Sequence, residues 1–399
     1  MLGRCILSCV AALAVTASAV GQCVFDSMSD GSDGDFSPQV VDIVIDLGLA
    51  ATGSWNTPGD GNGVYDPDRW VVVFKYMAIN IPPNLTVTFI NHPSGAPVVW
   101  LASEDVVIAG TVKLNGEGEF SPNGPFEYAK GGPGGFDGGA GGLTGFAPSC
   151  GFGPGGGDPG IGGSYASGAD PYGNVSIIPL IGGSGGGGDQ HFLGAAKPGG
   201  AGGGAILIAS SGTISLLGAP SIEAKGGDIS SGQLGGRGSG GGIRLIAQTI
   251  SGDGTLTAVG GTSGGSPGRI RLEACDLADY TGTTNPFRTT SGPGDVIKFA
   301  NAPTLRVTMV DGQAVPADPD ARVLTKEVVA SNDVVTLTIE ATNIPVGVQV
   351  LVLVTPAHGN CGFALSSPLA GSIGLSTAEA VITLTEFPTE IQLKANWVP

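Results

Sequence analysis

A short apolar phrase, in which hydrophobic residues fall at every second position, recurs along the middle of this chain. In the first copy Val98, Trp100 and Ala102 alternate with Val99 and Leu101. The later copies are Ala205/Leu207/Ala209, Ile243/Leu245/Ala247 and Ile270/Leu272/Ala274. A second alternating stretch follows the first three copies, and glycine closes it at Gly116, Gly226 and Gly260. Period-two alternation predicts strands, and its recurrence at roughly 20–30 residues predicts a solenoid whose coils stack on one another.

Equivalent positions in the copies predict which residues meet inside this solenoid. Alternate residues share a strand face, so we expect one inward column made of Trp100, Leu207, Leu245 and Leu272. The outward residues of the early copies are also apolar, namely Val99, Leu101, Ile206 and Ile208. Another segment should therefore cover them, and the nearest candidate carries Val175, Ile177, Ile178 and Ile181.

The flanking zones differ in composition. Residues 22–69 are rich in Asp, Gly and Ser and are expected to cap the solenoid, which we place at 70–300 with a glycine-dominated excursion at 117–203. Residues 301–399 contain less glycine and carry several short alternating stretches, which predicts an immunoglobulin-like β-sandwich. The predicted fold is all-β, a parallel β-helix with a long Gly-rich insertion followed by a β-sandwich.

Composition supports this fold class and excludes some partners. The chain has 72 Gly and 28 Pro in 399 residues, and both residue types disfavour helix. Its mean hydropathy is positive, unlike that of an intrinsically disordered chain. A net charge of −17, with only 17 Lys and Arg, argues against nucleic acid or anionic lipid as partners.

The first residues have the pattern of an export signal. Arg4 precedes an apolar run, and small residues at Ala17 and Ala19 provide a cleavage site, so residues 1–21 are predicted to be a signal peptide. We expect a secreted, extracellular or cell-surface protein, and no second apolar segment is long enough for an integral membrane span.

Four cysteines remain after the predicted cleavage, Cys23, Cys150, Cys275 and Cys361. An even number in an oxidising compartment allows two disulfides with three connectivities, while free buried thiols remain an alternative. Pairing of Cys275 with Cys361 would fasten the sandwich to the solenoid.

Residues 88–102, Thr-Phe-Ile-Asn-His-Pro-Ser-Gly-Ala-Pro-Val-Val-Trp-Leu-Ala, lead into Ile-Ala-Gly-Thr-Val at 108–112 and then into glycine tracts. This pattern resembles uncharacterised glycine-rich secreted proteins of environmental bacteria, whose coils look like those of large parallel β-helix surface proteins. The resemblance covers roughly residues 30–275. It implies a β-helix and a bacterial exported protein, and it brings no catalytic residues.

An acidic loop is the best candidate for a metal site. Asp60, Asn62, Asp66 and Asp68 place oxygen ligands on a Gly-broken loop, as calcium requires, and Asp30, Asp33 and Asp35 form a weaker version. Val64 occupies a ligand position and no Glu closes the first loop, so neither loop has EF-hand spacing. Solvated turns are the alternative for both.

The sequence gives little support for catalysis. The G-x-S-x-G matches around Ser184 and Ser266 arise readily by chance in a chain this rich in Gly and Ser. Polysaccharide cleavage needs carboxylates on neighbouring coils, but the outward positions Lys113, Glu223 and Thr257 provide only one.

We therefore expect a structural or adhesive protein without catalytic activity, whose partners are surface or matrix glycans or proteins. The alternative is a carbohydrate-binding or polysaccharide-cleaving protein with its site in the excursion 117–203, whose aromatic residues include Phe126, Tyr128, Phe136, Phe152, Tyr165 and Tyr172.

Overall fold

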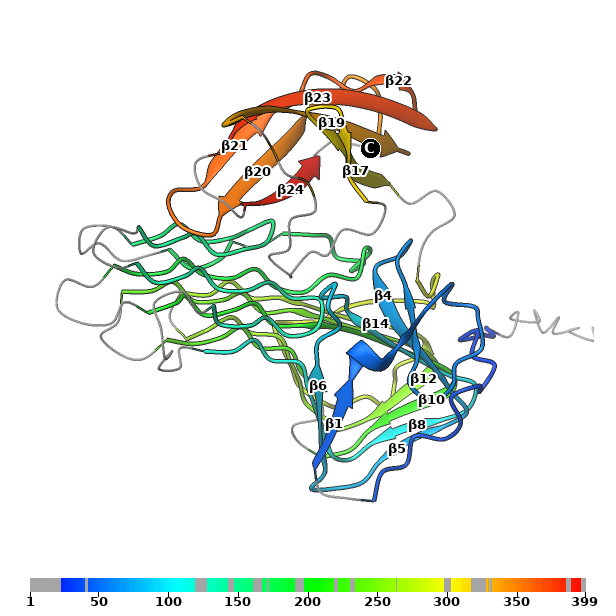
Figure 1. Cartoon of the computed structure of the whole chain (residues 1–399). Coiled ribbons are helices and arrows are strands. Elements are labelled where there is room, and N and C mark those ends of the chain that lie inside the picture. Colours follow the sequence, from blue (N-terminus) through cyan, green and yellow to red (C-terminus); the bar gives the residue numbers. More distant parts are fainter. Residues whose placement is uncertain are drawn as a thin grey trace, which may run out of the picture.

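A computed structural model of the chain is built almost entirely of strands, in agreement with the predicted all-β class (Figure 1). It describes residues 23–39, 42–118, 128–142, 147–160, 167–170, 172–190, 197–218, 222–229, 234–262, 264–297, 303–316, 328, 330, 332–384 and 389–395. Within these ranges the one helix is the 3-10 turn η1 (Leu47–Leu49). The predicted signal peptide, residues 1–21, lies outside the described residues.

Two sheets form what we call the parallel body. The larger sheet has the order β16 (Thr289–Ser291), β14 (Arg269–Asp276), β12 (Gly242–Gly252), β10 (Ala205–Leu216), β7 (Val98–Ala102), β4 (Val71–Tyr76), β3 (Val64–Asp66) and β2 (Ala51–Thr52), with β5 (Ile79–Ile81) and β8 (Val106–Ile108) beside this path. The smaller sheet has the order β1 (Asp42–Asp46), β6 (Thr86–Ile90), β9 (Thr111–Lys113), β11 (Ile222–Glu223), β13 (Leu256–Thr257) and β15 (Thr284–Asn285).

Strand neighbours in both sheets are parallel, with the exception of β3 and β4. From β9 onward the chain alternates between the sheets, so each strand lies next to the one that left the same sheet a turn of chain earlier. Parallel strands need such crossovers, because a tight hairpin can only join antiparallel ones.

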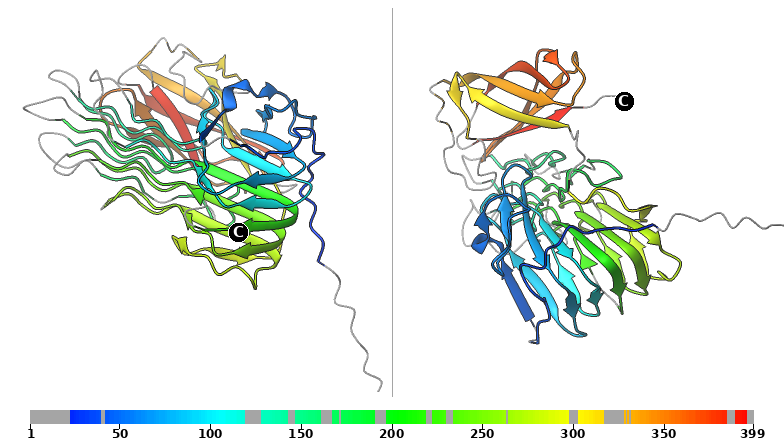
Figure 2. Two further views of the ribbon diagram at one scale, coloured as in Figure 1. Left: turned by 90° about the horizontal axis from the view of Figure 1, so that it is seen from below. Right: turned by 90° about the vertical axis from the view of Figure 1, so that its right-hand side faces the viewer.

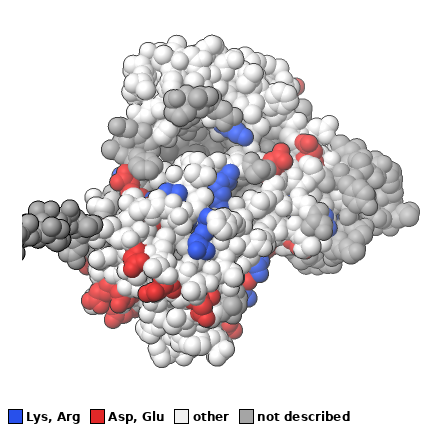
Figure 3. Space-filling model, turned by 180° about the vertical axis from the view of Figure 1, so that it is seen from behind, with Lys and Arg blue, Asp and Glu red and all other residues white. Residues whose placement is uncertain are grey.

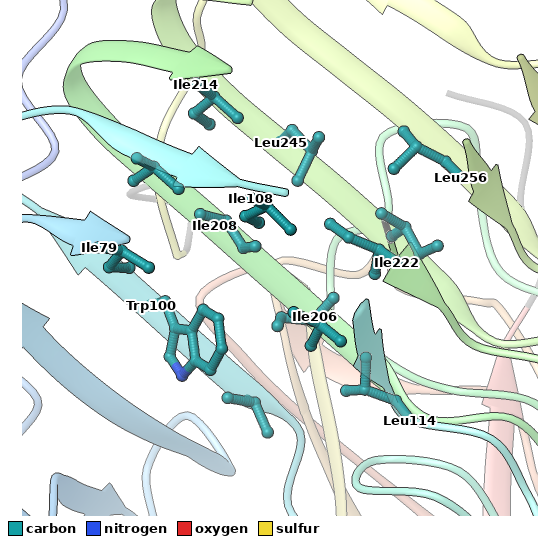
Figure 4. Packing of buried hydrophobic residues seen from close by; sticks show 14 of the residues in the cluster. Ile79, Trp100, Ile108, Leu114, Ile206, Ile208, Ile214, Ile222, Leu245 and Leu256 are labelled. Atoms are coloured by element: carbon teal, nitrogen blue, oxygen red, sulfur yellow. The ribbon is translucent and has the colours of Figure 1, made fainter. Parts of the chain in front are cut away.

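The space between the two sheets holds the main hydrophobic core. Register places Trp100 beside Ile208, Ile208 beside Leu245 and Leu245 beside Leu272, and all four belong to this core. Figure 4 shows Trp100, Ile208 and Leu245 pointing into it. The predicted inward column is therefore wrong at one member, because Ile208 occupies the place expected for Leu207.

The outer face of the larger sheet carries a second apolar cluster. Leu207 packs there with Val99 and Leu101 and is covered by Ile177, as expected, and by Leu180. Val175 is exposed, and the expectation that Ile206 and Ile208 face outward is wrong, because both lie in the core between the sheets. Both faces of β7 and β10 are thus buried. A strand buried on both faces has apolar residues throughout, so alternation alone did not identify the inward face of residues 205–209.

The first described residues form a strap across the ends of the strands. The Ser29 hydroxyl donates to the carbonyl of Tyr76 at the end of β4, and the Ser27 hydroxyl donates to the carbonyl of Ala102 at the end of β7 (2.6 Å each). Cys23 then forms a disulfide with Cys275 on β14. Figure 2 shows this segment in dark blue, running across the strands of the larger sheet.

Where the structure describes it, the glycine-dominated excursion forms a bundle of packed segments. We use the name glycine bundle for residues 128–142, 147–160, 167–170, 181–190, 197–204, 224–229, 234–241, 258–262 and 264–268. Its segments run side by side from the parallel body (Figures 1 and 2). The central segment, 182–188, exchanges backbone hydrogen bonds of 2.7–3.3 Å with segments on several sides, including those of Gly139, Phe152, Ser167 and Gly200.

Close packing explains why glycine dominates this bundle. A Cβ added at Gly202 would meet the carbonyl of Gly183, and one added at Gly188 would meet that of Ala140, both well inside 3.0 Å. Backbone groups rather than side chains therefore make the contacts between segments.

The described strands between residues 304 and 395 form two antiparallel sheets with a shared core, which we call the C-terminal unit. One sheet has the order β18 (Gln313–Ala314), β17 (Thr304–Val310), β19 (Val334–Thr342), β23 (Leu375–Thr383) and β22 (Ala370–Ser372). The other has the order β21 (Gly362–Leu365), β20 (Val350–Pro356) and β24 (Thr389–Ala395).

The four cysteines pair as Cys23–Cys275 and Cys150–Cys361. The considered pairing of Cys275 with Cys361 is wrong, because Cys275 lies under the strap. Cys361 instead reaches Cys150 in the glycine bundle, and nearby the Tyr128 hydroxyl donates to the carbonyl of Ala357 (3.1 Å). These two links hold the C-terminal unit against the bundle.

Candidate functional site

A cleft of about 600 Å³ lies between the glycine bundle and the C-terminal unit. Its floor is the bundle's edge at residues 239–242, and its roof comes from residues 303–305 and 393–395 of the C-terminal unit. One wall is the chain at 172–182. Ligand sites are concave, largely apolar and commonly of this size, so the cleft is the candidate functional site.

The wall at 172–182 is held in shape by its own side chains. The Asn174 carboxamide donates to the carbonyl of Ile178 (2.6 Å) and accepts from the amide of Ser176 (3.0 Å). The Tyr172 hydroxyl donates to the carbonyl of Gly182, which closes the segment on itself. Ile177 is buried against the larger sheet, so the wall is anchored from below as well.

Two basic residues line the cleft from opposite sides. Arg269 begins β14 and donates to the carbonyl of Gly173 (3.3 Å), while Lys394 is half-buried on β24. Burial lowers the pKa of Arg269, and the nearby Tyr172 hydroxyl acts in the opposite direction. An arginine stays charged at any physiological pH, because its ordinary pKa is so high.

The charge of the cleft contrasts with that of the whole chain. Among the described residues, neither Asp nor Glu lines it, and neither Arg269 nor Lys394 has a carboxylate partner. Figure 3 shows basic side chains at and below the hollow between the two parts, acidic side chains on either side of it, and a larger acidic group at the lower edge. The cleft is thus a cationic site on a protein of net charge −17.

The predicted calcium loop lies beside β3, and its Asp68 lines a smaller pocket that shares Ile177 and Pro179 with the cleft. Asp66 is buried, and its carboxylate pairs with Arg69 (2.9 Å) and accepts from the amide of Trp55 (2.8 Å). Asp60, Asn62 and Asp68 are exposed. In the described chain, Asp60, Asp66 and Asp68 do not converge as a group of ligand atoms within 4.8 Å of one another. Calcium binding at this loop stays a prediction.

The second acidic loop belongs to the strap. Asp30 pairs with the buried Lys75 (2.9 Å), and Asp33 accepts from the amides of Lys75 (2.6 Å) and Gly61 (2.8 Å). Burial acts to raise the pKa of Asp30, but hydrogen bonds from Ser32 and Lys75 outweigh it and hold the pKa below its usual value. These carboxylates fasten the strap to β4, and Asp35 is exposed.

Carboxylates on the smaller sheet are also engaged. Register places Lys113, Glu223 and Thr257 side by side, as expected from the repeats. Glu223 accepts from Lys225 (2.5 Å) and from Asn115 (3.1 Å). In the part of the chain that the structure describes, the one convergent group of His, Cys, Asp or Glu is Cys150, Asp158 and Cys361, whose two sulfurs form a disulfide.

The aromatic residues of the excursion have different positions. Tyr172 lines the cleft, whereas Phe136 and Phe152 are buried in the bundle. Tyr128 packs edge-on against Phe152 at 5.4 Å between ring centroids. Phe126 and Tyr165 lie outside the described residues.

Sequence reasoning missed the cleft's basic residues. Arg269 follows a glycine tract and Lys394 lies in a late strand, so nothing in their local sequence relates them. The available signal was that basic residues are scarce, with only 17 Lys and Arg in the chain, so the position of each one is informative.

Comparison with known proteins gives no relative, since no protein family, curated protein or solved structure matches this chain. None of the helices in the described ranges has the length and apolar character to cross a membrane.

Proposed function

We propose that this chain is an exported structural or adhesive protein of the cell surface or extracellular matrix, without catalytic activity. In this proposal the parallel body is a parallel β-helix and the C-terminal unit an immunoglobulin-like sandwich. The sequence resemblance to glycine-rich secreted bacterial proteins supports the same view.

The observation that carries the proposal is the use of all four cysteines after residue 22 in long-range bridges. The bridges span 252 and 211 residues of sequence, and each joins two separate parts of the molecule. Disulfides persist in oxidising compartments, so the pattern fits a protein that works outside the cytoplasm. Cys23 lies directly after the predicted cleavage site, where the mature chain and its strap would begin.

The glycine bundle supports a structural role. Its segments are held by backbone hydrogen bonds on several sides and present few side chains. Such a module supplies rigidity and extended surface.

Expression of the full chain in a secreting bacterium tests export. We expect a surface or medium fraction whose N-terminus lies near residues 20–22 and whose four cysteines are oxidised. A chain without residues 2–21 is the control and should stay in the cytoplasm. Full-length protein that remains cytoplasmic with four free thiols would contradict the proposal.

Incubation of the purified protein with matrix polysaccharides tests the absence of catalysis. We expect retention on immobilised polysaccharide with no release of reducing or unsaturated ends. Steady release of such ends would favour the second candidate, a carbohydrate-active protein. The observation that favours carbohydrate recognition is the cleft, with Tyr172 and two cations on its lining.

A further inference from the structure

The cleft has the chemistry of a site for an anion. Arg269 and Lys394 approach it from different parts of the chain, and among the described residues no carboxylate neutralises either one. An anion that enters the cleft therefore meets two cationic side chains and no competing carboxylate from the described lining. The guanidinium of Arg269 matches a carboxylate or sulfate in a two-pronged geometry.

The rest of the lining suits a sugar rather than a simple ion. Tyr172 and the rings of Pro154, Pro179 and Pro267 offer flat apolar surface, against which the apolar face of a sugar ring packs. The glycine backbone at 239–242 allows close approach of a ligand to main-chain groups. A site of about 600 Å³ has room for an oligosaccharide of a few units.

The geometry points to an acidic oligosaccharide as the ligand of this cleft, with its anionic groups at Arg269 and Lys394 and a sugar ring on Tyr172. This ligand deepens the proposed function. It rests on that proposal only in placing the encounter with the ligand outside the cell. The acidic remainder of the surface repels long polyanions, so the site takes a short acidic glycan or the acidic end of a longer one.

Isothermal titration of the disulfide-bonded mature protein with trigalacturonate tests this inference. The fully methyl-esterified trimer is the neutral probe of the same shape, and a sulfated disaccharide tests the other anionic group. We expect trigalacturonate or the sulfated sugar to bind, the ester to bind at least about tenfold more weakly, and added salt to weaken binding.

Matched variants locate the site. Arg269→Met and Lys394→Met keep most of each side chain and remove its charge, and each should weaken binding about tenfold. Arg306→Met is the control, because Arg306 is paired with Glu340 and is not itself a lining residue, although its neighbour Leu305 is. Melting temperatures of the three variants show whether any loss reflects misfolding.

Several results would overturn the inference. These are equal binding of the ester, unchanged affinity in both cleft variants, or binding of a hexaglutamate peptide in preference to the sugars. Failure of export leaves the titration unaffected, since the purified protein is used, so the two proposals fail separately. If a variant loses binding and also has a lowered melting temperature, Tyr172→Phe and Tyr172→Ala are compared instead. Both lose the hydroxyl that donates to Gly182, and only the alanine variant also loses the stacking ring.

Discussion

Replacing Gly202 by alanine should destabilise the protein strongly, although Ala is ordinarily a favourable substitute for Gly. The added Cβ would overlap the carbonyl of Gly183 in the central segment of the glycine bundle. Relief requires the two segments to separate. That separation weakens the bonds that Gly202 donates to Phe136 (2.8 Å) and Gly183 donates to Gly203 (2.7 Å).

The cost follows from these contacts. Overpacking of a close-packed interior costs about 1–3 kcal/mol. Each weakened backbone bond adds roughly 1 kcal/mol. Gly202→Ala should therefore lower the free energy of unfolding by about 3–5 kcal/mol.

Gly264→Ala is the matched control in the same bundle. Its Cβ would meet only the side chain of Arg237, at 3.6 Å, and its backbone does not need a positive φ. The substitution should be neutral or stabilise by about 0.4–1 kcal/mol, because alanine restricts the unfolded chain. Urea denaturation followed by tryptophan fluorescence and circular dichroism measures both. Equal midpoints for the two variants would refute a close-packed bundle and leave an ordinary loop.

Four further predictions follow from the core, the acidic loop, the smaller sheet and the disulfides. Leu245→Ala should cost about 2–5 kcal/mol in denaturation, because the side chain is fully buried; a loss below about 1 kcal/mol would contradict the register. If the loop near β3 binds calcium, the melting temperature should rise with calcium and Asp66→Ala should remove the rise, whereas indifference to calcium and chelator would leave a solvated turn. Burial acts to raise the pKa of Glu223, but hydrogen bonds from a lysine and an asparagine lower it overall. The stabilisation from Glu223 is therefore present above pH about 4.5 and is lost as the pH falls through the lower pKa of the folded protein. Glu223→Gln should flatten the acid-unfolding profile in this range, and an unchanged profile would contradict the prediction. Non-reducing peptide mapping should recover Cys361 linked to Cys150, and recovery with any other cysteine would contradict the structure.

Strands with one buried face were predictable from the sequence. Residues 335–339 alternate cleanly between buried apolar and less buried polar side chains, and they lie in β19. Alternation failed at 205–209, where both faces are apolar because Ile177 and its neighbours cover the outer one. Pairing with β7 decides that Ile208 points inward, and the local sequence pattern of residues 205–209 does not contain that information.

The glycine bundle and the cleft were beyond this kind of reasoning for different reasons. Glycine has no side chain, so a segment such as 182–188 shows no period, and its partners are fixed by backbone geometry alone. The cleft is assembled from segments far apart in sequence, whose proximity depends on the bundle and on a disulfide. Even the correct count of cysteines left three connectivities open.

The rigidity of the bundle bears directly on the cleft. A site between two parts of a chain normally spends binding energy on fixing their relative positions. Here Cys150–Cys361 joins the bundle to the C-terminal unit, and Arg244 holds the intervening chain by donating to the carbonyls of Asp295 (2.7 Å) and Val296 (2.9 Å). Arg244 is itself pinned by a buried ion pair with Glu273 (2.9 Å). The cleft walls are therefore set before any ligand arrives, and an acidic oligosaccharide needs only a few well-placed contacts to be retained.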